Sequence, residues 1–323
     1  MDQLRALRVF SKVVGEGSFA GAARALDMAP AVVTRTVAEL GAHLGARLLQ
    51  RTTRRLALIA AGETYLSTTR RLLAELDDAD AQAGASTAQP RGSLRVMAPP
   101  AFAVHQLAKH LPRFRALYPQ VSLELSMPGP VEVADENFDV SIVSVGQQAL
   151  QGEFIVRRLA RSTFVLCASP EYLDRRGRPA HPDALLQHDG LLPAVAAVRR
   201  QLTLYRVADD GAARSEAGTP DIVTIPTPTP ALSTGHIDML LAAAVTGLGI
   251  AGLPSFVADA ALREGRLERV LPQWHGGALT VCAAMPTRKQ VPARTRAFVD
   301  FLVDCFGGAE RDPWLPIAEG QRA

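Results

Sequence analysis

The chain has 323 residues, of which 48% are hydrophobic and 21% are charged; this balance excludes global disorder and suits a small domain with a large one, or three small domains. No basic-then-apolar leader opens the chain, no apolar run reaches the roughly 18 residues of a membrane span, and the cysteines (Cys167, Cys282 and Cys305) lie far apart, so we expect a cytoplasmic protein with reduced thiols. The net charge of +3 is uneven, because residues 1–60 hold nine basic and four acidic residues and are therefore the basic part of the chain.

Apolar spacing predicts three helices in the basic segment. The first runs from about Asp2 to Val14, and a second over 19–26 has Ser18 as a suitable N-cap. After a short turn, Pro30 occupies the first position of the third helix, where proline is best tolerated. Two short helices joined by a tight turn, with another packed behind, predict a helix-turn-helix over about 18–37, whose second helix enters the major groove of double-stranded DNA.

The exposed face of the third helix and the segment after it carry side chains suited to DNA. Thr34 offers a hydroxyl, Arg35 offers a fork-shaped donor for guanine or phosphate, and residues 47–58 resemble a two-stranded wing with arginines at its tip. A solvated hairpin is the alternative for the wing, but beside a helix-turn-helix we favour DNA contact. The predicted DNA-binding set is Ser18, Pro30, Ala31, Thr34, Arg35, Arg51, Thr52, Arg54 and Arg55.

A long helix is expected next, from about residue 61 to 84. Apolar positions recur in steps of four and three, which is typical of a heptad seam, and the proposed dimerisation residues are Tyr65, Thr69, Leu72 and Leu76. The alternative is a helix packed on its own domain. Residues 85–92 are interpreted as a hinge.

Beyond the hinge, strand and helix patterns alternate, which predicts a parallel α/β architecture. Strands are expected at 94–97, 121–126, 140–144, 164–168, 250–253 and 279–284, and helices at 101–118, 237–245, 258–264 and 293–305. Residues 247–252 fit a dinucleotide fingerprint by letter, but a helix precedes them and a strand follows, which is the wrong context. Residues 205–230 are interpreted as a mobile loop or a flap, and 306–323 as a flexible tail in which Trp314 docks.

The N-terminal motifs resemble those of a known family. Phe19-Ala20-x-Ala22-Ala23-x-x-Leu26, Pro30-x-x-Val33-Thr34-Arg35, Leu44-Gly45-x-x-Leu48-Leu49-x-Arg51-Thr52 and Ala61-Gly62 are similar to the signature of LysR-type transcriptional regulators. The similarity continues to about residue 305. Ala29 stands where the family usually has a capping serine, Gly41 replaces a glutamate, and Ile59 replaces a threonine, so details of contact differ.

This resemblance implies an α+β multi-domain fold. A winged helix-turn-helix would occupy 1–59, a linker helix 60–84, and an effector-binding domain 93–305. That domain would consist of two Rossmann-like subdomains of the type-two periplasmic-binding-protein kind, joined by crossovers near 161–165 and 265–270. Subdomain I would then cover about 93–161 and 270–305, and subdomain II about 162–269. The family also implies a dimer, assembled further into a tetramer, on an interrupted palindromic operator, with RNA polymerase as a partner.

A small-molecule effector would bind between the subdomains, at strand ends and helix N-termini. The predicted ring is Pro100, Ala101, Phe102, Ser126, Met127, Ser144, Gly146, Thr163, Ser233, Thr234 and His236. Plain N-capping is the alternative for Ser233, and a solvated surface histidine is the alternative for His236. The expected ligand is a partly apolar organic acid or a neutral metabolite.

Two other classes of protein compete with a regulator. A solute-binding module is opposed by the missing leader and the arginine-rich wing. A cofactor-dependent enzyme is opposed by the absence of any catalytic constellation, and the seven histidines are scattered, so we expect no enzyme, cofactor or metal site.

Overall fold

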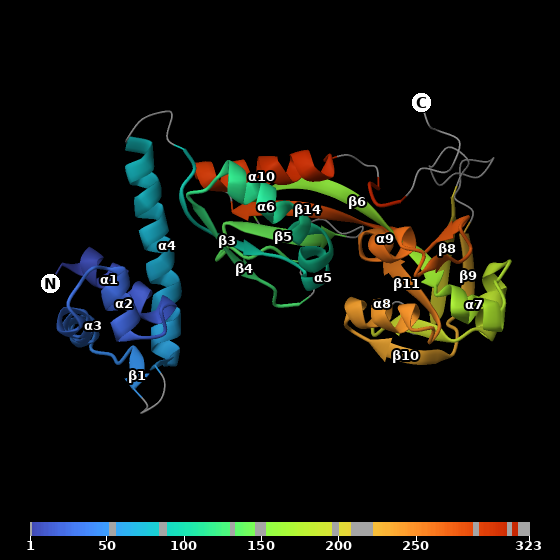
Figure 1. Cartoon of the computed structure of the whole chain (residues 1–323), viewed down its shortest axis with the longest axis horizontal. Coiled ribbons are helices and arrows are strands. Elements are labelled where there is room, and N and C mark those ends of the chain that lie inside the picture. Colours follow the sequence, from blue (N-terminus) through green and yellow to red (C-terminus); the bar gives the residue numbers. More distant parts are fainter. Residues whose placement is uncertain are drawn as a thin grey trace. The chain divides into compact units, whose positions relative to one another are not determined.

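The computed structural model describes residues 2–51, 56–83, 89–129, 133–145, 153–195, 200–207, 222–286, 291–308 and 312–315 (Figure 1). Two compact units result. The first comprises 1–93 with 120–122 and 292–294, and the second comprises the remaining residues. No helix among the described residues is long and apolar enough to cross a membrane.

The N-terminal unit is built from helices whose ends follow the sequence signals. Asp2 caps α1 (Gln3–Gly15), and the Ser18 side chain accepts a hydrogen bond from the Gly21 N–H at the start of α2 (Phe19–Ala25). Helix α3 (Pro30–Leu44) begins at its proline without a side-chain cap, because Ala29 has no acceptor, and it ends at Gly45 in the left-handed conformation. The bounds of α1 and α2 and the start of α3 agree with the sequence prediction to within a residue.

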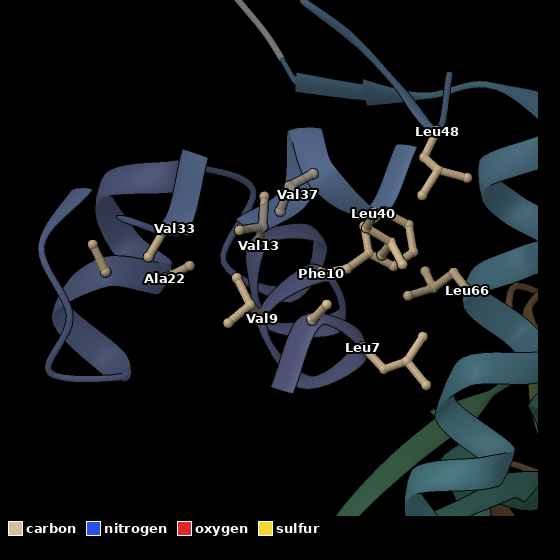
Figure 2. Close-up of a cluster of buried hydrophobic side chains, with 12 residues drawn as sticks. Leu7, Val9, Phe10, Val13, Ala22, Val33, Val37, Leu40, Leu48 and Leu66 are labelled. Carbon is tan, nitrogen blue, oxygen red and sulfur yellow. The ribbon is translucent and has the colours of Figure 1, made fainter. Parts of the chain in front are cut away.

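One apolar core joins these helices to α4 (Ala60–Ala83). Figure 2 shows Leu66 of α4 beside Phe10, Leu40 and Leu48, all of them buried. At Gly62 a Cβ would lie 2.0 Å from the Leu48 carbonyl oxygen, so only glycine lets α4 approach the chain before the wing this closely. The wing itself is an antiparallel pair, β1 (Leu49–Arg51) and β2 (Leu56–Leu58).

The second unit contains a mixed sheet, not the parallel one that the sequence suggested. Its strand order is β10-β7-β11-β6-β14-β5-β3-β4, with β12 (Glu268–Arg269) beside β6. The strands are β3 (Gly92–Met97), β4 (Val121–Ser126), β5 (Val140–Val145), β6 (Phe154–Ala168), β7 (Gly190–Pro193), β10 (Pro230–Thr234), β11 (Ile250–Pro254) and β14 (Ala278–Pro286). Strand β6 is antiparallel to both β14 and β11, whereas β7 is parallel to β10 and β11.

Strand β6 passes from one subdomain to the other. It pairs with β14 up to Thr163 and with β11 from Phe164 onward, so the first crossover lies within the expected range 161–165. The return crossover was expected at 265–270, but β12 in that range still pairs with Cys167 and Ala168. The chain instead returns at Gly276 and Gly277, which exchange backbone hydrogen bonds with Phe164.

Helices cover the sheet, and a smaller sheet lies in subdomain II. The helices are α5 (Pro100–Phe102), a π-helix (Ala103–Leu107), α6 (Ala108–Leu117), α7 (Pro170–Arg176), a 3₁₀ helix (Pro182–Gln187), α8 (Ile237–Val245), α9 (Ser255–Arg263) and α10 (Ala293–Phe306). The second sheet has the order β13-β8-β9, with β8 (Gln201–Arg206), β9 (Ile222–Pro226) and β13 (Trp274–His275). It occupies part of the segment 205–230 that was interpreted as a loop, while 208–221 lie outside the described residues.

Residues 247–252 follow α8 and lead into β11, as expected, and Gly247, with a φ of +78°, ends the helix in the left-handed conformation, so this segment is not a dinucleotide loop.

Candidate functional site

The exposed face of α3 presents the predicted recognition residues. Ala31, Thr34 and Arg35 are exposed, and the Arg35 side chain retains 82% of its accessible surface. Its Nε lies 2.8 Å from Glu39 Oε1, one turn further along the helix. An exposed ion pair of this kind contributes little free energy, so the Arg35 guanidinium can exchange Glu39 for another partner.

Other members of the DNA-binding set have local roles. The Thr34 hydroxyl donates to the Pro30 carbonyl oxygen at 3.0 Å, and the Ser18 hydroxyl oxygen accepts from the Gly21 N–H at 3.0 Å. Thr52, Arg54 and Arg55 lie outside the described residues, as does the side chain of Arg51, whose backbone belongs to β1.

A hollow of about 470 Å³ separates α3 from the wing. Thr34, Ala38 and Arg47 are among the residues that line it, so Arg47 shares a surface with the recognition helix. Arg47 lies in the basic segment 1–60 but is not among the predicted DNA-binding residues. Its place before β1, at the root of the predicted wing, is the signal that could have included it.

Helix α4 divides the predicted dimerisation seam between two faces. Tyr65 and Leu73 pack against the core of the N-terminal unit, with the Tyr65 and Phe10 ring centroids 6.1 Å apart, and Thr69 is 1% exposed. Leu72 is 49% exposed, and Leu76 is half-buried. The alternative reading, a helix packed on its own domain, therefore describes Tyr65, whereas Leu72 remains available to a partner.

In the second unit, Phe102 does not line a cleft. It is fully buried in a cluster of aromatic rings, with centroids 5.2 Å from Phe306, 5.5 Å from Phe256 and 6.4 Å from Trp314. We expected Phe102 to offer apolar surface to a ligand, but its ring instead packs against rings of both subdomains.

The C-terminal segment docks at the same junction. Trp314 is only 6% exposed, and Asp312 accepts hydrogen bonds from the Ser255 hydroxyl and, at 2.7 Å, from the Thr163 backbone N–H. Residues 312–315 are therefore packed rather than flexible, which corrects that part of the tail prediction. The partial docking of Trp314 was anticipated, but its partners were not.

The remaining members of the predicted effector ring have mixed environments. Met127 is 47% exposed, Pro100, Ser126 and Ser144 are half-buried, and Ala101 is buried. Ser233 and His236 are exposed, and Thr234 Oγ1 accepts from the His236 N–H at 3.2 Å. Gly146 lies outside the described residues. Since His236 is the N-cap residue of α8 and gives no side-chain cap, the plain capping role considered for Ser233 is wrong.

Two contacts that were not predicted from the sequence join subdomain I to subdomain II. His105 Nε2 lies 2.7 Å from Asp238 Oδ1 in α8, and Gln106 Nε2 donates to the Phe256 carbonyl oxygen at 2.6 Å. Both residues belong to the π-helix, a form that often marks functional positions. Its wider turn is not visible in the apolar spacing, so no sequence signal pointed to these contacts.

The described residues favour no catalytic or metal chemistry. Burial raises the pKa of Cys167 to about 12 and also raises the pKa values of Cys282 and Cys305, so these thiols are not activated nucleophiles. Among the described residues no group of three or more His, Cys, Asp or Glu is placed to hold a metal ion.

Comparison with known proteins identifies the family to which the chain is similar. Residues 4–63 match the bacterial regulatory helix-turn-helix protein, lysR family, and residues 87–306 match the LysR substrate binding domain. The chain is 32% identical over 319 residues to an HTH-type transcriptional repressor of Pseudomonas aeruginosa, covering 98% of this chain and 96% of that one. It is 33% identical over 310 residues to the HTH-type transcriptional regulator CrgA of Neisseria meningitidis, covering 93% and 96%.

Solved structures agree with this placement. CrgA from Neisseria meningitidis superposes with a TM-score of 0.56 at 29% identity, covering 94% of this chain and 98% of that chain. A full-length OxyR variant from Pseudomonas aeruginosa gives a TM-score of 0.60 at 17% identity, covering 94% of both, a likeness of fold alone. The related proteins are transcription regulators and not enzymes, which excludes the two competing classes. The chain belongs to the LysR family of bacterial transcription regulators, with a helix-turn-helix DNA-binding domain and an effector-binding domain.

Proposed function

We propose that this regulator acts in the cytoplasm and binds an interrupted palindromic operator as an oligomer, with α3 of each subunit in a major groove. The supporting observation is the exposed face of α3, where Arg35 extends into solvent beside Ala31 and Thr34. A guanidinium in this position can read guanine through two parallel hydrogen bonds. Ser18, Pro30 and the arginines Arg51, Arg54 and Arg55 would contact the phosphate backbone, together with Thr52 and Arg47.

We further propose that a small organic acid or neutral metabolite binds in the cleft between the subdomains and changes how the oligomer holds DNA. The start of α8, beside Ser233 and Thr234, supports this proposal. Helix α8 begins without a side-chain cap, so the backbone N–H groups of its first turn can donate hydrogen bonds to a ligand. The His105–Asp238 contact joins subdomain I to α8 of subdomain II. A ligand that breaks this contact would therefore change how the two subdomains are held together. A tetramer and contact with RNA polymerase belong to the same proposal.

Replacing Arg35 tests the recognition role. Arg35→Ala should cost about 1–3 kcal/mol of affinity for the specific operator and relax the preference at one base pair, because a bidentate base contact is lost. Gel-shift titration of the operator and of randomised single-position variants measures both effects. Arg266→Ala is the control, since it removes an exposed, ion-paired arginine from the effector-binding domain. Unchanged operator binding by Arg35→Ala would show that α3 does not read bases through this residue.

A further inference from the structure

A carboxylate lies on the face of α3 that the proposed function turns toward DNA. Glu39 is the only acidic residue between Asp27 and Glu63, a stretch that also holds Arg35, Arg47 and the arginines of the wing. Its side chain retains 45% of its accessible surface. A negative charge at this position repels phosphates, so Glu39 opposes the attraction that the surrounding arginines supply.

Helix stability is a weak reason for this carboxylate. Glu39 Oε1 accepts a hydrogen bond from Arg35 Nε at 2.8 Å, one turn earlier in the helix, and both side chains are exposed. In pairs of this kind a helix is stabilised more when the acidic residue comes first, and here it comes second. Replacing Glu39 by glutamine, which favours helices about as well, should therefore leave α3 folded.

The bond between the two side chains leaves their DNA-binding groups available. It uses Nε of Arg35, so the two terminal nitrogens can still donate to O6 and N7 of a guanine. It also uses one oxygen of Glu39, so Oε2 can still accept. Residues four apart are separated by about 6 Å along a helix axis, and base pairs are stacked about 3.4 Å apart. With α3 in the major groove, Glu39 would thus meet a base pair one or two steps from the guanine.

A carboxylate can only accept hydrogen bonds, which limits what it can bind in the major groove. Guanine presents acceptors there, thymine presents an acceptor and a methyl group, and the phosphates are anionic. Cytosine and adenine present amino groups, but adenine also places the acceptor N7 beside its amino group. Cytosine is therefore the base whose major-groove edge suits a carboxylate best.

We propose that Glu39 is a specificity-determining residue, which accepts a hydrogen bond from the N4 amino group of a cytosine one or two base pairs from the guanine bound by Arg35. This role rests on the proposed position of α3 in the major groove. Where that cytosine is absent, the carboxylate meets acceptors or phosphates, so it weakens binding to unrelated DNA. Glu39 increases the discrimination between sequences more than it increases affinity.

Selection of duplexes from a random-sequence library by the full-length protein needs no known operator. The parent should select half-sites with a guanine and, within two base pairs of it, a cytosine. Glu39→Gln should keep the guanine and exchange the cytosine for adenine, since an amide pairs with N6 and N7 of adenine. In titrations, Glu39→Gln should bind the parent's selected site about tenfold more weakly but a mixed-sequence duplex more tightly, because one negative charge is removed. A loss of helix stability would instead weaken binding to both duplexes.

Glu16→Gln is the matched control, because Glu16 forms a similar pair with Lys12 in α1, at 2.9 Å, and this variant should select the parent's sequence. If Glu39→Gln does not fold by circular dichroism, Glu39→Asp, which keeps the charge on a shorter side chain, should lose the preference for cytosine without binding mixed-sequence DNA more tightly. A folded Glu39→Gln that still selects the cytosine would overturn the proposal. Loss of the guanine by Arg35→Ala in the same selection would then show that α3 still reads DNA, whereas selection of the parent's sequence by both variants would overturn the recognition role of α3 as well.

Discussion

At the scale of single residues, the two helices of the helix-turn-helix begin differently. Ser18 gives α2 a side-chain hydrogen bond, whereas Ala29 gives α3 none, although its φ of −64° and ψ of 136° already have the extended geometry of a cap. The recognition helix thus depends on Pro30 and on packing for its start. A serine at residue 29 would find the N–H groups of the first turn already in place.

Ala29→Ser should therefore raise the unfolding free energy of the N-terminal unit by about 1 kcal/mol, the usual worth of an N-cap. Urea titration followed by circular dichroism measures the change. Ala31→Ser is the control, because it puts the same hydroxyl inside α3, where serine is slightly worse than alanine. Equal effects of the two substitutions would mean that solvation, and not capping, is responsible.

His275 is a single residue that makes stability depend on pH. Its Nδ1 lies 3.1 Å from the Gly277 N–H, and burial lowers the pKa of His275, as it does for His110 and His188. Because the unfolded chain binds protons near the ordinary histidine pKa of about 6.5 and the folded chain does not, stability is present above that pH and is lost as the pH falls through it.

We expect the effector-binding domain to unfold at lower urea concentration at about pH 5.5 than at about pH 7.5, and His275→Asn to reduce that difference. Asparagine can still accept from the Gly277 N–H but does not titrate. Trp274 emission reports the transition. A pH dependence that is the same in both proteins would assign it to the other buried histidines.

At the scale of elements, α4 shows how one helix serves a core and leaves a face for association. Leu66 and Thr69 are buried, whereas Leu72 is half exposed between them and the end of the helix. Isolated helices of this length gain most of their stability from packing, so an exposed leucine on this face favours a partner helix.

Leu72→Glu should dissociate the oligomer and keep the N-terminal unit folded, because a buried unpaired charge is costly only where a partner covers it. Leu66→Glu, in contrast, should unfold the unit, since Leu66 belongs to its core. Light scattering and circular dichroism together distinguish the two results. A wild-type mass for Leu72→Glu would place the subunit interface elsewhere.

The elements also show what the sequence could reveal. The helices α1 to α4 and α8 were predictable because their apolar spacing and caps are local signals. Strand β6 was recognised only over its last residues, since Arg157, Arg158 and Arg161 interrupt the apolar pattern. Short strands such as β7 and β10 hold too few residues to show a period, and β10 begins at a proline. The aromatic cluster around Phe102 depends on distant contacts that no local pattern encodes.

In the whole molecule, residues 312–315 contact both subdomains of the effector-binding domain. Trp314 contacts Phe102 and Phe306 from subdomain I and Phe256 from subdomain II, and Asp312 bonds to Ser255 and Thr163 at the crossover. A buried ring between two lobes contributes to the stability of both. The family resemblance, which ended at about residue 305, gave no indication of this contact.

Trp314→Ala should destabilise the effector-binding domain by about 3–5 kcal/mol, as large truncations in cores do, and leave the N-terminal unit unchanged. Calorimetry of the full chain separates the two transitions. Trp314→Phe, which keeps a ring, should cost much less. A shift of both transitions together would show that the two units unfold as one.

The contacts of residues 312–315 have a consequence for folding during synthesis. A ribosome delivers a chain from its N-terminus at about 5–20 residues per second, and domains fold as they emerge. The core of the N-terminal unit is complete once α4 has emerged, whereas residues 312–315 follow every element that they contact. A nascent chain therefore passes through a stage in which the N-terminal unit is folded but the two subdomains of the effector-binding domain are not yet joined by residues 312–315. Translation that stops before Asp312 would leave the protein in that stage, as a competitor for its own operator.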